Sequence, residues 1–191
     1  MTQETSDHAA QDGEQIRVLI VEDEADLADM YAEYLPEYDT SIAYGGEEAL
    51  DALSGEYDVI LLDRRMPVVS GTEVLAAIEE QKLDCRVAMV TAVNPDFDII
   101  DLRIDDYVVK PVTRAELRET VDRLLKLEEY NERMQDLTSK KLKRNVLEVE
   151  KTRAELSESD EFEQLQSEIS ALESELDTLA AELDAEDPDT A

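Results

Sequence analysis

Glycine and proline divide this chain of 191 residues into two unlike parts. All five glycines fall within the first 71 residues, and neither glycine nor proline occurs between Val112 and Asp187. Because these residues are the strongest local breakers of regular structure, turns punctuate the first part, while the second can be helix with few breaks. The length suits one well-cored domain with an appendage.

Short apolar runs alternate with helical patterns in the first part. The pattern predicts five strands, at Arg17–Val21, Asp39–Ala43, Asp58–Asp63, Arg86–Val90 and Asp106–Val109. It predicts helices at Asp26–Leu35, 46–54, Gly71–Gln81 and, as a short one, Asp96–Leu102. A fifth helix starts at Thr113, where Glu116 completes a capping box. This alternation predicts an α/β fold with a doubly wound, five-stranded parallel sheet.

Charge limits the classes of partner. The chain has 50 acidic against 18 basic residues and a formal net charge of −32, which repels DNA and anionic membranes in dilute salt. In about 1 M salt the Debye length is only about 3 Å, so the acids hardly repel one another. Acids outnumber bases along the whole sequence, and we therefore expect a halophilic protein.

Cysteine and histidine are rare. Cys85 is the single cysteine, which excludes an intrachain disulfide and fits a reducing interior. The only histidine, His8, lies in the small polar stretch 1–14, where we expect a solvated, disordered tail and no metal ligand. No signal peptide is recognisable, and no apolar run approaches the roughly 18 residues of a membrane span. We expect a cytoplasmic location.

Polar side chains follow four of the predicted strands where each strand ends. Glu22 and Asp23 follow the first, Asp63 closes the third, Thr91 follows the fourth, and Lys110 follows the fifth. These ends share the carboxyl edge of the sheet, where ligands bind in open α/β folds. Clustered carboxylates suit Mg²⁺, and a lysine and a threonine can bind phosphoryl oxygens. The set predicts phosphoryl transfer onto a carboxylate.

Each residue alone has an ordinary structural explanation. In so acidic a chain, Glu22 or Asp23 is as readily a solvated rim residue, Thr91 a helix cap and Lys110 a surface lysine. The conjunction of these residue types, in this order at four strand ends, favours a functional site.

The segments VLIVEDE, VILLDRRMPVVSG, VAMVTA and DDYVVKPV resemble the receiver domain of two-component response regulators, over about residues 16–128. The resemblance implies that Asp63 accepts a phosphoryl group from the phosphohistidine of a sensor histidine kinase. It implies Asp23, Asp63 and the backbone carbonyl of Arg65 as Mg²⁺ ligands, with Glu22 holding metal-bound water. Slow self-phosphorylation and self-dephosphorylation are the only turnover it implies.

The same resemblance assigns roles around the phosphoryl group. Thr91 and Lys110 would grip it, Tyr107 matches the aromatic switch residue, and Ala92 matches the small residue that leaves the site open. The positions that influence phosphate lifetime are Arg65 and Val93. The bond between Lys110 and Pro111 is expected to be cis.

One departure concerns the turn before the last strand. Many receivers have Gly-Ala there, whereas this chain has Arg103-Ile104-Asp105-Asp106, so we expect the turn to differ.

Apolar residues continue beyond the receiver in two arms. The first arm starts from the receiver-facing residues Leu117, Val121, Leu124 and Leu125 and continues irregularly through Met134, Leu137, Leu142, Val146, Val149 and Leu156. A break is expected at Ser157–Asp160. The second arm has regular heptad spacing, at Phe162, Leu165, Ile169, Leu172, Leu176, Leu179 and Leu183, the lower limit for a coiled coil.

Charge separates the two arms. The first carries Lys140, Lys141, Lys143, Arg144, Lys151 and Arg153, and no lysine or arginine follows Arg153. This favours a helical hairpin or pairing between two subunits over the alternative, in which each stripe packs on its own receiver.

A receiver with such a tail, in so acidic a chain, resembles haloarchaeal response regulators that carry a HalX-type C-terminal domain, over about residues 113–184. The expected domains are a disordered tail (1–14), the receiver (15–128), a helical output domain (129–184) and a disordered acidic end (185–191).

The favoured function is a phosphorylation-controlled switch whose helical tail changes protein contacts, with a homodimer through the receiver or the tail as one such contact. The alternative is a DNA-binding transcriptional regulator that uses Lys140, Lys141, Lys143 and Arg144 on phosphates. No helix-turn-helix signal supports it, and phosphate contacts weaken at high salt. A phosphatase usually carries an acid where Arg65 stands, and a purely structural coiled coil would not need the strand-end residues.

Overall fold

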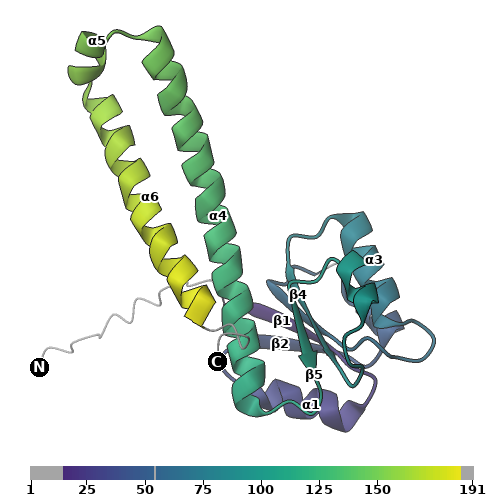
Figure 1. Ribbon diagram of the computed structural model, residues 1–191. Coiled ribbons are helices and arrows are strands. Elements are labelled where there is room, and N and C mark those ends of the chain that lie inside the picture. Colours follow the sequence, from purple (N-terminus) through teal and green to yellow (C-terminus); the bar gives the residue numbers. More distant parts are fainter. Residues whose placement is uncertain (1–14, 54, 186–191) are drawn as a thin grey trace, which may run out of the picture.

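The computed structural model describes residues 15–53 and 55–185, so the expectations for residues 1–14, for residue 54 and for residues 186–191 fall outside it. Within the described part, a sheet flanked by helices is joined to a long helical hairpin that projects away from it (Figure 1).

The sheet has five parallel strands in the order β2-β1-β3-β4-β5. Their bounds are β1 Arg17–Val21, β2 Asp39–Ala43, β3 Val59–Leu62, β4 Arg86–Thr91 and β5 Asp106–Val109. The predicted fold is therefore confirmed. Strand β3 is one residue shorter at each end than expected, and β4 is one residue longer because Thr91 still pairs with Val109.

Helices cover both faces of the sheet. Their bounds are α1 Ala25–Tyr34, α2 Gly46–Ala52, α3 Gly71–Gln81 and α4 Arg114–Glu150. The apolar side chains of α2 and α3 pack with Leu19, Val21 and Leu62 on one face. Those of α1 and the first turns of α4 pack with Val18, Ile20 and Leu61 on the other. The strands are buried on both sides, as their uninterrupted apolar runs require.

The expected short helix is a 3₁₀ turn, η1, at Phe97–Asp101. The side chain of Asp96 accepts a hydrogen bond from the amide of Phe97 and caps it. Phe97 and Ile100 are 86% and 75% exposed, Ile99 is half-buried, and no residue of η1 is fully buried, so η1 lies on the surface.

Asp105 holds the turn before β5, where the sequence departs from the receiver pattern. Its carboxylate accepts a hydrogen bond from the amide of Val87 at 2.8 Å and pairs with Arg86 at 3.0 Å. Its own amide donates to the carbonyl of Val87 at 2.8 Å. The side chain thus fastens the turn to the start of β4.

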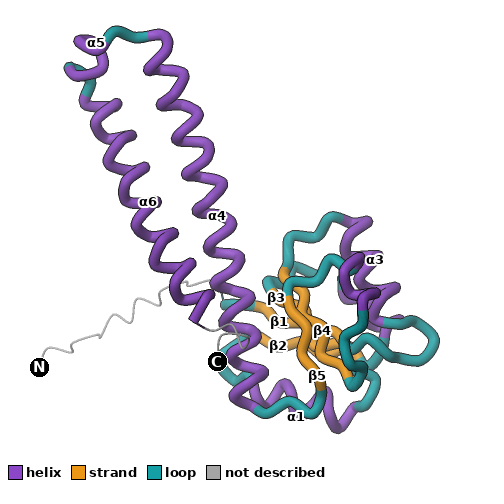
Figure 2. Tube along the Cα trace, viewed as in Figure 1, coloured by secondary structure: helices purple, strands orange, loops and turns teal. Residues whose placement is uncertain are grey.

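Helix α4 runs unbroken from the sheet to the end of the hairpin (Figure 2). A complete capping box between Thr113 and Glu116 starts it, as predicted. A short helix α5 at Arg153–Ser157 then leads to α6 at Asp160–Ala185. The break expected at Ser157–Asp160 is present, because α5 ends at Ser157 and α6 begins at Asp160. The earlier interruption at Lys151 and Thr152, where α4 ends, was not predicted, and α6 extends one residue beyond the expected domain end.

The hairpin alternative for the tail is confirmed, because α4 and α6 pack antiparallel. Ion pairs join Lys126 to Glu182, Arg133 to Glu175 and Lys140 to Glu168, at 3.4, 2.9 and 2.8 Å. The apolar contact between the helices is centred on Leu137, Ile169 and Leu176, with Tyr130, Leu165 and Leu172 beside them. Of the irregular stripe expected on the first arm from Met134 to Val149, only Leu137 is buried, whereas Met134, Leu142, Val146 and Val149 are exposed.

None of the helices within residues 15–53 and 55–185 has the length and apolarity to cross a lipid bilayer.

Candidate functional site

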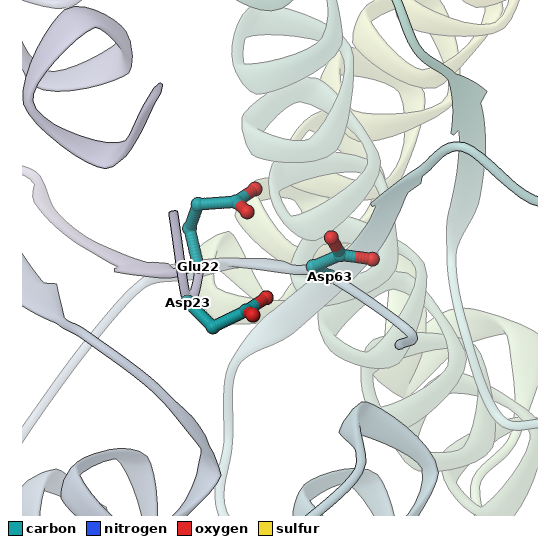
Figure 3. Close-up of side chains that lie close together, drawn as sticks. All are labelled: Glu22, Asp23 and Asp63. Atoms are coloured by element: carbon teal, nitrogen blue, oxygen red, sulfur yellow. The ribbon is translucent and has the colours of Figure 1, made fainter. Parts of the chain in front are cut away.

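The acidic residues predicted from the strand ends meet at one point of the sheet. Glu22 and Asp23 follow β1, and Asp63 follows the neighbouring strand β3. Between these two strands the chain reverses the direction in which it adds strands, and such a switch point leaves a crevice at the carboxyl edge. The side chains of Glu22 and Asp23 extend toward the side on which Asp63 lies, and the three carboxylates lie close together (Figure 3).

The donor set fits a magnesium ion. One carboxylate oxygen from each of Glu22, Asp23 and Asp63 lies within 4.8 Å of the others. Glu22 and Asp63 are only 2% and 7% exposed, and Asp23 is half-buried. Hard oxygen ligands gathered on an accessible rim suit Mg²⁺, which keeps part of its water shell in protein sites.

Lys110, at the end of β5, holds two of the acids together. Its ammonium donates to Glu22 Oε2 at 2.5 Å and to Asp63 Oδ2 at 2.6 Å. Burial is the largest influence on the Lys110 pKa and opposes the charge, but the bonds to both carboxylates together outweigh it and raise the pKa. Burial also raises the pKa of Glu22, and the pairing with Lys110 offsets this only in part. The ammonium is thus present as the counter-charge of the acidic cluster.

Thr91 is fully buried at the end of β4, where it pairs with Val109, the residue before Lys110. Its carbonyl accepts the amide hydrogen of Lys110 at 2.9 Å, and its hydroxyl accepts that of Val93 at 3.4 Å. Ala92 is exposed between them. The peptide bond after Lys110 is cis, as predicted. The structure therefore brings all five strand-end residues to one edge.

Tyr107 is half-buried and hydrogen-bonded. Its hydroxyl donates to the carbonyl of Val93 at 2.8 Å, which ties β5 to the loop after β4. The ring packs against the apolar cluster on the α2 and α3 side of the sheet.

Arg64, which the sequence analysis did not single out, joins this region to η1. Its guanidinium pairs with Asp98, and hydrogen bonds to Asp98 and then to Tyr107 are the main causes of its raised pKa. The residue therefore links the loop after β3 to both η1 and β5. No spacing in the sequence predicts the ion pair, because Arg64 and Asp98 lie 34 positions apart.

Two backbone features shape the loop after Asp63. The amide of the exposed residue Arg65 donates to Asp63 Oδ1 at 3.1 Å, which orients the carboxylate. Gly71, the first residue of α3, lies directly against the loop: a Cβ placed there would meet the carbonyl oxygen of Asp63 at 2.1 Å. The glycine that ends the segment VILLDRRMPVVSG thus permits close packing behind Asp63.

The basic residues of the tail do not join this site. They lie on the outer half of α4, where Lys140 and Lys141 pair with Glu168 and Glu173 of α6 at 2.8 and 2.7 Å. Arg144 lies near Glu148 at 3.8 Å, and Lys143 is exposed.

Two family descriptions match the chain. Residues 18–122 match the response regulator receiver domain, and residues 126–191 match the HalX domain. A Haloferax volcanii protein, provisionally named a transcriptional regulator, is 54% identical over 110 residues, which cover 56% of this chain and 19% of that protein. The response regulator SaeR of Staphylococcus aureus is 37% identical over 114 residues, covering 56% of this chain and 50% of SaeR. The match thus spans half or less of each of these relatives.

The fold also resembles solved structures. The response regulator protein TrrA of Thermotoga maritima, solved in complex with Mg(2+)-BeF, has a TM-score of 0.52 and 37% sequence identity. The similarity covers 57% of this chain and 98% of TrrA.

Proposed function

Because the chain belongs to the response regulator receiver domain family, we propose that it accepts a phosphoryl group on Asp63 from a sensor histidine kinase. Members of this family are regulators rather than classical enzymes. The observation that carries the proposal is the meeting of three carboxylates at the switch point of the sheet, with the Lys110 ammonium bonded to two of them.

In the proposed transfer, a carboxylate oxygen of Asp63 attacks phosphorus. The new bond joins that oxygen to phosphorus, and the bond from phosphorus to the histidine nitrogen of the kinase breaks, returning its electron pair to the imidazole. Asp63 is oriented for this role by the Arg65 amide on Oδ1 and by Lys110 on Oδ2. Lys110 and the Thr91 hydroxyl then bind the phosphoryl oxygens. The Lys110 ammonium, which was paired with carboxylates, thereby becomes the counter-charge of the phosphoryl group.

We propose Asp23, Asp63 and the backbone carbonyl of Arg65 as ligands of Mg²⁺, with Glu22 bound through water. The ion, when bound, supplies positive charge that neutralises the oxygens of the transferring phosphoryl group. The closeness of the three carboxylates supports this assignment.

The proposed response begins when Thr91 moves toward the phosphoryl group. The space it leaves would let Tyr107 turn inward, which breaks its bond to the Val93 carbonyl. Ala92 leaves the site open to the phosphoryl group, and Arg65 and Val93 flank it and would set its lifetime. We propose residues 15–128 as the receiver and residues 129–184 as the output domain. The acidic surface and single cysteine fit a cytoplasmic protein of a saline cell.

Intact-mass spectrometry tests the acceptor. After treatment with acetyl phosphate and Mg²⁺, the wild type should gain one phosphoryl group and Asp63→Asn none, while the control Asp101→Asn, changed on the exposed η1, should react as the wild type does. A modified Asp63→Asn chain would identify another acceptor and overturn the proposal.

The alternative output is DNA binding, which the name of the Haloferax volcanii relative favours. Pairing of Lys140 and Lys141 with α6 weighs against it, because both cations are already neutralised. Binding to genomic fragments in concentrated KCl, compared between wild type and the double variant Lys140→Glu/Arg144→Glu, decides the matter. Sequence-selective binding that the variant loses would establish DNA as the target.

A further inference from the structure

The hairpin leaves much of its apolar surface uncovered. On α6, Phe162, Ile169 and Leu176 are buried. The alternate heptad positions, Leu165, Leu172 and Leu179, are only half-buried. These three recur every seven residues, so they form a stripe along one side of the helix. Two helices alone do not enclose such a stripe, since each presents an apolar arc wider than one neighbour covers.

The uncovered surface is largest at the outer end of the hairpin. There Leu142, Val146 and Val149 of α4 are 65%, 55% and 81% exposed. A groove of about 710 Å³ lies between the helices at this level, with Leu142, Val146, Leu147 and Leu165 among its lining residues. We call this region the hairpin tip groove.

The walls of the hairpin tip groove carry opposite charges. Lys140 and Lys143 line it from α4, and Glu161 and Glu168 line it from α6. The contrast extends beyond the groove. Residues 138–153 hold six basic and two acidic residues, whereas Asp160–Ala185 contains no basic residue at all. Lys143 is exposed and, within the described residues, its charge acts on Glu168 across the groove without a close ion pair, so its ammonium can still bind a carboxylate of a partner.

We propose that the hairpin tip groove binds the same groove of a second copy of this chain. A two-fold axis parallel to the long axis of the hairpin places the basic wall of each copy on the acidic wall of the other, and it makes α4 antiparallel to α6 of the partner. The four helices then enclose Val146, Leu147 and Leu165 as a bundle core. A groove with one cationic and one anionic wall is complementary to itself in this arrangement.

Nucleic acid fits the same groove less well. The acidic wall repels phosphates, and Lys140 is already bonded to Glu168 across the groove at 2.8 Å. A polyanion would also leave the exposed Leu142 and Val146 in water, whereas a second copy buries them.

Sedimentation equilibrium of the full chain in molar KCl tests the proposal. The wild type should form a dimer of twice the 21.6 kDa chain mass. Val146→Glu should weaken the dimer at least about tenfold, because it places an unpaired charge in the bundle core. The exposure of Val146 in the single chain means that the variant keeps its fold, which circular dichroism checks. The control Ile100→Glu, an exposed apolar residue of η1, should dimerise as the wild type does.

Charge reversal identifies the pairing. Lys143→Glu and Glu161→Lys should each weaken self-association, and an equimolar mixture of the two variants should form heterodimers, because each contact then joins opposite charges again. Three results would overturn the proposal: a monomeric wild type, a dimer lost in Ile100→Glu but kept in Val146→Glu, or a monomer that binds DNA through Lys143. The test is independent of phosphorylation, since Asp63→Asn should dimerise unchanged.

Discussion

Lys110 shows how much of the candidate site depends on single charges. Its ammonium is bonded to Glu22 and Asp63, and it is the only cation bonded to that pair among the described residues. The arrangement resembles a partly buried ion triad, in which removal of the central partner leaves like charges facing each other.

Replacement of Lys110 by Ala should lower the free energy of unfolding in EDTA by about 3 kcal/mol, and Mg²⁺ should restore part of it because the ion binds only the native cluster. Urea unfolding with and without Mg²⁺ measures both effects. Lys151→Ala, which removes an exposed pair within the hairpin turn, should cost less than about 0.5 kcal/mol. Equal losses in the two variants would contradict the central role of Lys110.

A second prediction at the scale of single residues concerns Gly71. Gly71→Ala should cost about 1–3 kcal/mol of unfolding free energy and slow phosphorylation by acetyl phosphate, because its Cβ would displace the backbone of Asp63. Gly55→Ala is a matched control, since the nearest atom there belongs to the side chain of Tyr57, which can move. A fully reactive Gly71→Ala chain would show that the loop tolerates the shift.

The folding stability and the thiol reactivity of Cys85 should both depend on pH. Burial raises the pKa of its thiol from an ordinary value of 9.0 to about 11. The folded state therefore disfavours the thiolate. The contribution of the buried, un-ionised Cys85 thiol to folding stability is complete below pH 9 and is lost as the pH rises toward 11. At pH 8, iodoacetamide should label the native chain about tenfold more slowly than the urea-unfolded chain. Equal rates would mean that Cys85 is accessible.

Site residues were predictable where the sequence kept them at strand ends. Asp63 and Lys110 each follow an apolar strand, so the fold alone brings them together. Arg64 and Asp98 could not be found in this way, because their pairing depends on where the loop before η1 happens to pass. Asp105 was visible only as a departure from the family pattern, and its bonds to β4 give the reason for it.

At the scale of elements, η1 lies on the surface of the receiver with no buried residue. Asp98→Asn removes its ion pair with Arg64, and the change should hardly alter the free energy of unfolding because Asp98 is largely exposed. The amides of Ile99 and Leu102 should nevertheless exchange several-fold faster with deuterium, since local opening of η1 becomes easier. Asp101→Asn is the control. Unchanged exchange in Asp98→Asn would show that the pair does not hold η1.

The boundaries of elements were predictable where a local signal decided them. Gly71–Gln81 and Arg17–Val21 match at both ends because turn residues and apolar periodicity agree there. The break at Ser157–Asp160 was predicted from its N-cap residues and separates α5 from α6, whereas the earlier end of α4 at Glu150 was missed. Thr152 and Glu155 form a capping box with the same spacing as Thr113 and Glu116, and that signal marks the start of α5. The apolar residues of α4 misled because Leu142, Val146 and Val149 stay exposed in the hairpin, so their spacing does not report a buried contact.

At the scale of the whole molecule, the net charge of −32 dominates. Mutual repulsion of the acids favours the expanded chain, and salt removes it as the Debye length falls from about 30 Å at 0.01 M to about 3 Å at 1 M. The melting temperature should therefore rise steadily with KCl, by an amount that sucrose of equal osmolality does not reproduce. A melting temperature independent of KCl would mean that the acids are already balanced within the fold.

The unbroken course of α4 has a mechanical consequence. Its first turns are packed against the sheet through Leu117, Val121 and Leu124, and its last turns lie at the far end of the hairpin. From Val121 to Glu150 the helix is about 44 Å long at 1.5 Å per residue. A tilt of about 5° at the sheet would displace the far end by about 4 Å, as a lever arm does. A rearrangement too small to alter the core of the receiver is thus amplified into a movement comparable to the width of a side chain.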